Sequence, residues 1–237
     1  MKNKTLVLLV VPPKPPEPGA ARNPVKLDSA AGFAVLGAAA VENTGKTAVH
    51  GGDVGTSYGR EITGFPPGTV AMPHITRPAD GTAQQAHKDL TTAYDAAAAM
   101  PFTHDLSGQD LGGLTLLPGV YRFSAGATLN GTLTLDNQGD PDAKFVFQIG
   151  TTLTTGRDSS VILINGGPGV EVKSALTWLV GTSATIGADS AFEGNILARE
   201  DIMINTDASI RDGSALSEYG DVTLDSNRIT NDGQPPK

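Results

Sequence analysis

The chain has 237 residues, a formal net charge of −8 and no cysteine. The lack of cysteine excludes disulfides, thiolate metal sites and a thiol nucleophile. The acidic balance argues against a nucleic-acid partner, because no Lys/Arg stripe is present to neutralise phosphates.

The N-terminus has two interpretations. Lys2 and Lys4 precede an apolar run over residues 5–11 that is typical of a short secretory signal, although no clear small-residue cleavage site follows it. A disordered or expression-derived tail explains the same residues equally well. The run is too short to span a bilayer.

The domain limits follow from composition. Residues 12–24 are rich in proline and resemble an extended linker. We therefore expect residues 1–26 to form a signal-like or Pro-rich tail, residues 27–230 a single folded domain, and residues 231–237 a polar tail. The signal-like segment favours a secreted, extracellular protein.

Short strands interrupted by glycine are predicted at the start of the domain, over residues 33–37 and 48–55. After a helical stretch, strands follow in quick succession over residues 114–117, 120–123, 132–135, 144–149, 160–164, 170–173 and 176–180, and the last is expected over 228–230.

A long amphipathic helix is predicted over about residues 82–100. Thr82 and Gln85 fit a capping box, and Pro101 ends the run. Its thin apolar stripe can lie close against a sheet, so we expect the helix to cover one side of the domain. The stripe consists of Ala83, Ala86, Leu90, Tyr94 and Ala97.

A pattern returns every 18 to 20 residues near the C-terminus, in residues 184–189, 202–207 and 222–227. Each copy runs apolar, Thr or Met, apolar, turn residue, small residue, Asp or Asn. This period suits three short strands with tight corners, which make one coil of a solenoid. The predicted fold is dominated by β-structure: a right-handed, three-faced β-helix (β-solenoid) with one long α-helix packed alongside.

Catalytic chemistry is not indicated. The histidines show no metal-ligand spacing, and no G-x-S-x-G motif is present. Many β-helices are polysaccharide lyases or hydrolases, but such enzymes need clustered Asp, Arg or Lys in a groove. His87 lies beside Lys88 and Asp89 in the predicted helix and is expected at its solvated surface. We therefore expect a non-enzymatic protein with no metal and no cofactor.

A series of motifs, in order along the chain, resembles one known family. They occupy residues 33–37, 51–55, 62–65, 86–94, 116–121, 145–150, 152–155, 193–198 and 222–227. The chain resembles the microbial ice-binding (antifreeze) proteins over about residues 27–230. The resemblance implies a discontinuous β-solenoid with a helix alongside. It also implies a protein involved in cold adaptation, whose partner is the ice surface and its ordered water. We expect a monomer.

The resemblance also implies a flat face on which T-(A/G)-x-(T/N) motifs recur. Mapping those motifs onto this chain gives the candidate ice-binding residues Thr44, Thr47, Asn130, Thr132, Thr155, Ala188, Ser190, Thr206 and Ser209. Charged residues intrude on the motifs at Lys46, Arg157, Asp158, Asp189 and Asp207. Because charged groups hold their own oriented hydration, we expect weak to moderate activity.

Two alternatives remain open. The intruding charges also suit a structural or adhesive solenoid that contacts polysaccharide and does not bind ice. Asp189, Asp207 and Asn227 share one column of the repeat, so they could stack and recruit Ca²⁺ as a stabilising ion. The simpler interpretation of these residues is solvated corners favoured by turn chemistry.

Overall fold

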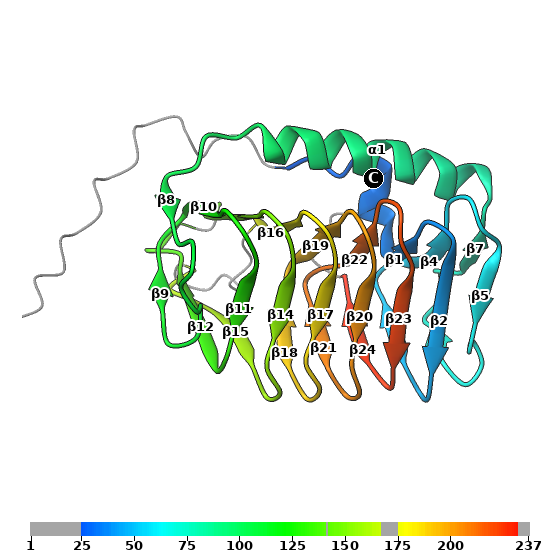
Figure 1. The fold of residues 1–237 in the computed structure, drawn as a ribbon. Coiled ribbons are helices and arrows are strands. Elements are labelled where there is room, and N and C mark those ends of the chain that lie inside the picture. The colour runs from blue at the N-terminus through cyan, green and yellow to red at the C-terminus, as the bar shows by residue number, and fades with distance from the viewer. Residues whose placement is uncertain (1–24, 141, 167–174, 232–237) are drawn as a thin grey trace, which may run out of the picture.

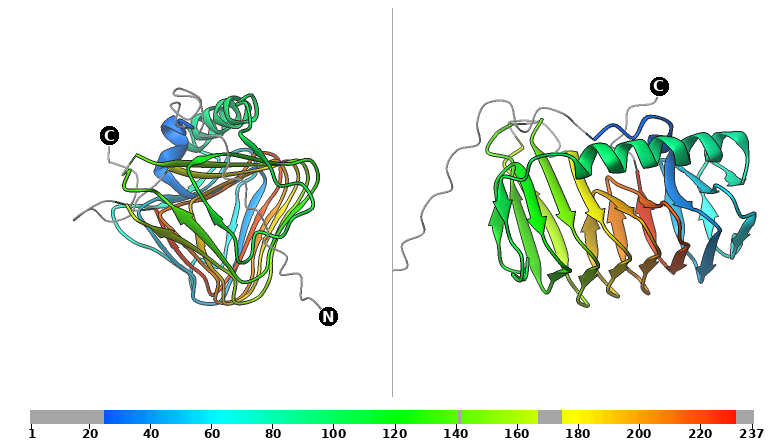
Figure 2. Two further views of the ribbon diagram at one scale, coloured as in Figure 1. Left: turned by 90° about the vertical axis from the view of Figure 1, so that its left-hand side faces the viewer. Right: turned by 45° about the horizontal axis from the view of Figure 1, so that its top comes forward.

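The computed structural model describes residues 25–140, 142–166 and 175–231 (Figure 1). Within these residues, strands form three sheets in which every strand pair is parallel, and the sheets make the sides of a roughly triangular solenoid (Figure 2). This confirms the predicted β-solenoid. The tail over residues 1–24 and the strand predicted over 170–173 lie outside the described residues.

Sheet A comprises, in spatial order, β7 (Thr76–Pro78), β4 (Asp53–Thr56), β1 (Phe33–Gly37), β22 (Ala215–Ser217), β19 (Asn195–Ala198), β16 (Ala175–Val180), β13 (Lys144–Ile149), β10 (Gly119–Phe123) and β8 (His104–Asp105). Sheet B comprises β11 (Ala127–Leu129), β14 (Leu153–Thr155), β17 (Ala184–Ile186), β20 (Ile202–Ile204), β23 (Val222–Asp225), β2 (Ala40–Thr44) and β5 (Glu61–Thr63). Sheet C comprises β6 (Thr69–Val70), β3 (Ala48–His50), β24 (Arg228–Thr230), β21 (Ser209–Arg211), β18 (Ala191–Glu193), β15 (Ser160–Ile164), β12 (Thr132–Asp136) and β9 (Thr115–Leu116).

The stacking of coils does not follow the chain. The first coil, formed by β1, β2 and β3, pairs with the last coil, formed by β22, β23 and β24. In Figure 1, the blue strands therefore lie beside the red ones. This is the discontinuous solenoid that the family resemblance implied.

Helix α1 (Gly81–Ala98) runs along the outside of sheet A. Four of its alanines, Leu90 and Tyr94 are buried against Leu36, Leu179 and other leucines of the sheet, together with the short 3-10 helix η1 (Asp28–Gly32). The predicted stripe, Ala83, Ala86, Leu90, Tyr94 and Ala97, is the side of the helix that packs on the sheet. The outer face of sheet A is therefore shielded from water.

The start of α1 differs from the prediction. The N-cap is Asp80, whose Oδ1 accepts a hydrogen bond from the Ala83 N–H at 2.8 Å. Gln85 does not reach back to Thr82; its amide donates to Asp89 Oδ1. The predicted capping box at Thr82 was wrong, because the Asp80 carboxylate, two residues earlier, already accepts the hydrogen bond from the first turn of the helix.

The prediction for His87 was also wrong. The side chain is buried, its Nδ1 lies 3.3 Å from Ser57 Oγ, and its ring packs edge-on against Tyr58. Burial lowers the pKa of His87, and the nearby Glu218 partly opposes this shift. His87 faces the solenoid because it lies four residues after Ala83 and three before Leu90, on the buried stripe of the helix.

A row of aromatic rings lies within the otherwise mainly aliphatic interior of the coils. Tyr121, Phe147 and Trp178 occupy the same register on β10, β13 and β16. Their ring centroids are 5.3 Å and 4.1 Å apart, and Phe192 adds a further ring 4.9 Å from Trp178. These few aromatic residues therefore extend one continuous core along several coils.

The column of corner residues also differs in part from the prediction. Asp189 and Asp207 both adopt left-handed backbone conformations and lie in register, but the next member is Ser226. Asn227 is instead buried, and its amide donates to the carbonyls of Asn205 and Ala208.

The cause is a change in corner length. Ile202 pairs with Val222, 20 residues later, whereas Ser209 pairs with Arg228, only 19 residues later. One residue is therefore missing from the last corner, which shifts Asn227 out of the aspartate column and into the interior.

Candidate functional site

The outer face of sheet B is the side of the solenoid that faces the viewer in Figure 1, and α1 lies against a different side (Figure 2). Strand alternation decides which side chains reach this face. In β17, Ala184 and Ile186 are buried and Thr185 between them points outward. The same alternation repeats on the neighbouring strands.

These outward positions form one column across the sheet, which we call the central column. Its members, each paired in register with the next, are Thr128, Thr154, Thr185, Met203, Thr223, Glu42 and Thr63. All of them are exposed or half-buried. Because neighbouring strands lie about 4.8 Å apart, the threonines of this column present methyl and hydroxyl groups at a regular spacing.

A second column lies beside the central column, at the corner between sheets A and B. Backbone hydrogen bonds place Thr152, Ser183, Asp201 and Asp221 in succession. The carboxylate of Asp201 accepts the Asp221 N–H at 2.9 Å, and that of Asp221 accepts the Ala40 N–H at 2.8 Å. These two aspartates therefore complete the backbone ladder where the chain turns the corner.

Three of the candidate ice-binding residues lie in the interior, which corrects the prediction for them. Thr47, Thr155 and Ser190 are 1%, 4% and 1% exposed. Thr47 Oγ1 accepts the Asn227 N–H, Thr155 Oγ1 accepts the Gly187 N–H, and Ser190 Oγ donates to the Gly156 carbonyl. Their hydroxyls stabilise the corners and cannot touch a surface ligand.

The other six candidates are accessible but do not share one flat face. Thr44, Asn130, Ala188 and Thr206 lie along the corner between sheets B and C, whereas Thr132 and Ser209 begin strands of sheet C. Three of their hydroxyls already have partners. Ser209 Oγ donates to the Ser190 carbonyl at 3.4 Å. Thr206 donates to Asp225, and Thr132 Oγ1 lies 2.8 Å from Ser160 Oγ.

Besides Glu42 in the central column, charged side chains lie at the corner with sheet C and at the β11 end of sheet B. At the corner with sheet C, Arg157 forms an ion pair with Asp189. At the β11 end, the Asp110 carboxylate accepts hydrogen bonds from Thr128 Oγ1 and Asn130 Nδ2, each at 2.6 Å. Partial burial opposes ionisation of Asp110, but these hydrogen bonds outweigh it and hold its pKa below the ordinary value.

Other kinds of site find little support in the part of the chain that the structure describes. It contains no group of three or more His, Asp or Glu side chains placed to hold a metal ion. None of its helices is both long and apolar enough to cross a membrane. The regular array on sheet B is therefore the feature that a function must explain.

The sequence carried a signal for the central column. Each repeat runs apolar, Thr or Met, apolar, and in a strand the middle residue of such a triplet points away from the core. The T-(A/G)-x-(T/N) motifs fall further along each repeat, at the corners, and so do not include Thr154, Thr185 and Thr223.

Comparisons with known proteins agree with this architecture. The family described as Ice-binding-like matches residues 35–230. An ice-binding protein of Nostoc sp. (strain HG1) is 47% identical over 206 residues, which cover 86% of this chain and 73% of that protein.

Solved structures of ice-binding proteins are similar as well. That of the Antarctic ascomycete Antarctomyces psychrotrophicus is 40% identical with a TM-score of 0.82, covering 90% of this chain and all of that one. The Shewanella frigidimarina ice-binding protein_1 DUF3494 domain is 31% identical with a TM-score of 0.75, covering 86% of this chain and 96% of that one. The matched family is described by what it binds and not by a reaction, which agrees with the non-enzymatic protein expected from the sequence. The chain belongs to the Ice-binding-like family.

Proposed function

We propose that this protein binds ice through the outer face of sheet B and thereby inhibits ice growth and recrystallisation. The observation that carries the proposal is the central column, in which Thr128, Thr154 and Thr185 are paired in register on adjacent strands. Such a column spaces hydroxyl and methyl groups about 4.8 Å apart on a rigid surface. The methyl groups order the first water layer and the hydroxyls anchor it, so many weak contacts add together.

The other two faces are less suitable. Sheet A is covered by α1 and η1. The outer positions of sheet C include Arg211 and Arg228, which are exposed cations. A charged group keeps a strongly oriented hydration shell, and removing that shell costs free energy. Sheet B therefore offers the surface most compatible with an ordered water layer.

The remaining candidates fit this proposal as a rim. Thr44, Asn130, Ala188 and Thr206 border sheet B, so a water layer ordered by the central column could extend to them. Thr132 and Ser209 lie on sheet C and are not part of the proposed surface. We expect weak to moderate activity, because acidic side chains share the face with the threonines.

A substitution on the central column tests the proposal. Thr154→Tyr adds a bulky ring to the middle of the face, and Thr69→Tyr places the same ring on the exposed strand β6 of sheet C. Thermal hysteresis and recrystallisation inhibition should fall for Thr154→Tyr and persist for Thr69→Tyr, with unchanged melting temperatures in both. Equal activity of the two variants would reject sheet B as the binding face. A parent protein that neither shapes nor slows ice crystals would reject ice binding itself.

The predicted monomeric state suits this mechanism, since a single exposed face meets the ice without help from a second copy. Light scattering coupled to size-exclusion chromatography tests the monomer. The secreted location inferred from the first residues stays a prediction.

A further inference from the structure

The outer face of sheet B is chemically divided along the solenoid axis. Each coil has a segment, here called a crossing, that turns the corner from sheet A and continues through a strand of sheet B. The crossings through β11, β14 and β17 are residues 124–130, 150–156 and 181–187, and none of them contains a charged residue. The next four crossings all lie toward the β5 end. They carry Arg199, Glu200 and Asp201 in the first, Glu218, Asp221 and Asp225 in the second, Glu42 in the third, and Arg60 and Glu61 in the fourth, so acidic side chains predominate.

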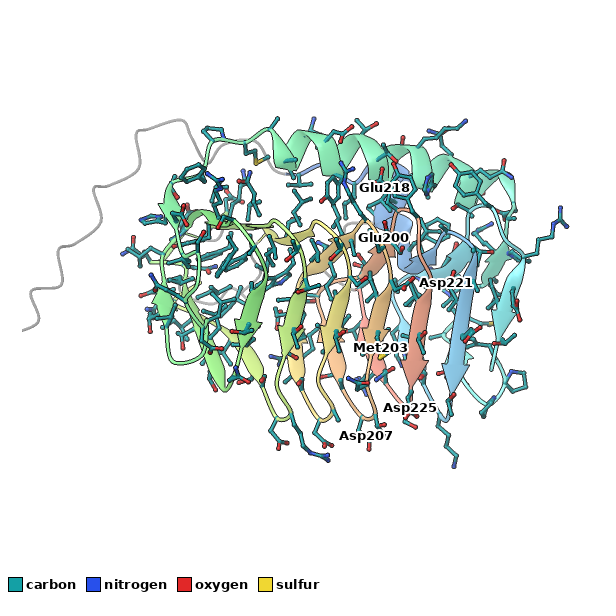
Figure 3. All side chains as sticks on the ribbon, viewed as in Figure 1. Glu200, Met203, Asp207, Glu218, Asp221 and Asp225 are labelled. Carbon is teal, nitrogen blue, oxygen red and sulfur yellow. The ribbon has the colours of Figure 1, made fainter. Side chains whose placement is uncertain are left out.

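The boundary between the two halves falls at β20. Met203 interrupts the threonines of the central column and is 47% exposed. In the neighbouring column, Asp201 follows the neutral Ser183. Figure 3 shows Met203 midway along its strand, with Glu200 and Asp221 toward the helix side and Asp207 and Asp225 toward the opposite corner.

The shape of the surface changes at the same place. A methionine side chain is longer than a threonine side chain, and Met203 is exposed whereas its neighbours Thr185 and Thr223 are half-buried. On the neutral side, Gly156 and Gly187 keep the surface low at the corner with sheet C. A Cβ on Gly187 would lie only 2.4 Å from the Gly156 carbonyl oxygen.

The opposite end of the neutral half is bounded as well. Asp110 lies beside β11 and holds the Thr128 hydroxyl and the Asn130 amide. The uncharged surface therefore lies between Asp110 at one end and Met203 with Asp201 at the other. Measured between its outermost backbone positions, this surface is about 10 Å wide across the strands, which is two strand spacings, and about 13 Å long along the strands, which is two side-chain repeats.

Hydration makes this division functional. A carboxylate in contact with ice would have to exchange its own water shell for a lattice it cannot match, at a cost that is large unless the charge is compensated. Threonine, serine and glycine carry no such penalty. A water layer continuous with ice is therefore favoured over the neutral strands and opposed over the acidic ones.

The geometry points to an ice-contact surface confined to the neutral half of sheet B, made by β11, β14 and β17 with the adjoining corner residues Thr151 and Thr182. Met203 and Asp201 end that surface, and the half made by β20, β23, β2 and β5 stays hydrated by liquid water. This inference rests on the proposed function and assigns it to part of the face.

Two matched variants test the confinement. Thr154→Tyr and Thr223→Tyr place the same ring in the same column, on β14 in the neutral half and on β23 in the acidic half. The confined surface predicts that Thr154→Tyr loses most of the thermal hysteresis and that Thr223→Tyr keeps most of it. Melting temperatures from circular dichroism establish that both variants are folded, which their positions on the outer face favour.

The possible outcomes separate this inference from the proposed function. Loss of activity in both variants would overturn the confinement and support binding by the whole sheet. Loss only in Thr223→Tyr would overturn it as well. No loss in either variant would reject sheet B altogether and with it both proposals.

A gain of function gives a second, independent test. The triple variant Glu200→Thr/Asp201→Asn/Met203→Thr extends the neutral surface by one strand, because Glu200 follows Thr151 and Thr182 in the same column. The asparagine oxygen can still accept the Asp221 N–H that Asp201 accepts. Thermal hysteresis should rise above that of the parent protein. An unchanged or lower hysteresis at an unchanged melting temperature would contradict a boundary at β20.

Discussion

The hydroxyl oxygen of Thr155 accepts a hydrogen bond from the backbone N–H of Gly187 at 2.8 Å inside the solenoid wall. Thr155 ends β14, and Gly187 follows β17, the next strand of sheet B. The side chain thus replaces a backbone acceptor where two neighbouring coils turn the corner. A residue that looks like part of a surface motif is in fact part of the stabilising framework.

Replacing Thr155 with valine keeps the shape of the side chain and leaves the Gly187 N–H without its acceptor. We expect the free energy of unfolding to fall by about 1–3 kcal/mol. The matched change Thr154→Val, on the exposed neighbour, should alter it by about 0.5 kcal/mol or less. Urea denaturation of both variants measures the free energy of unfolding. An equal decrease in both would show that the buried hydrogen bond contributes no more to stability than the exposed hydroxyl of Thr154.

The stability of the protein should depend on pH through Glu193. Burial is the largest influence on this carboxyl and raises its pKa to about 7, although the Arg211 guanidinium 3.2 Å away opposes the shift. The folded state therefore holds this proton more tightly than the unfolded state. The stabilisation that results is complete below about pH 4.5 and is lost as the pH rises through about 7.

The variant Glu193→Gln cannot titrate and isolates this effect. The parent protein should lose stability relative to the variant between about pH 4.5 and 7, by up to about 3 kcal/mol. The free energy of unfolding measured for both proteins at several pH values across that window provides the test. A difference that stays constant with pH would show that Glu193 titrates normally.

The cap of α1 gives a third prediction. Asp80→Ala removes the acceptor of the Ala83 N–H and the partner of Arg77, whose Nη1 lies 3.0 Å from Asp80 Oδ2. The free energy of unfolding should fall by about 1 kcal/mol. Thr82→Ala serves as the control, because Thr82 is exposed in the first turn and does not cap the helix. If Thr82→Ala lowered the free energy of unfolding as much as Asp80→Ala does, Thr82 and not Asp80 alone would cap the helix.

Removal of metal ions should leave the protein unchanged. Asp189 is already paired with Arg157, and Asn227 is buried away from the aspartate column. We therefore expect the same melting temperature with and without a calcium chelator. A lower melting temperature in the chelator, restored by added Ca²⁺, would favour the calcium-stabilised scaffold.

Several elements could be predicted because their causes are local. The strands over residues 33–37, 144–149 and 160–164 match β1, β13 and β15, since their apolar residues alternate or run together between turn residues. Helix α1 was found for a similar reason, from its apolar stripe. Its cap was missed because two nearby polar residues both satisfied the sequence rule.

The binding surface was harder to predict than the fold. In Leu153-Thr154-Thr155, alternation with the buried Leu153 already assigns Thr154 to the outside and Thr155 to the interior. Ser190 carries no comparable signal, because it follows a left-handed corner residue, Asp189, that resets which way the next side chain points. Corner geometry depends on the coil above and below, which the local sequence does not contain.

The sequence by itself determined the coil, because an 18- to 20-residue period of alternating apolar residues can bury its apolar face only by stacking on further copies. It also determined the outward position of the central threonines. Only the tertiary structure decided that the first coil pairs with the last, that one corner is a residue short, and that neutral and acidic crossings collect on separate halves of sheet B. Those features depend on which coils become neighbours in space, and that order is set by packing between segments far apart in the chain.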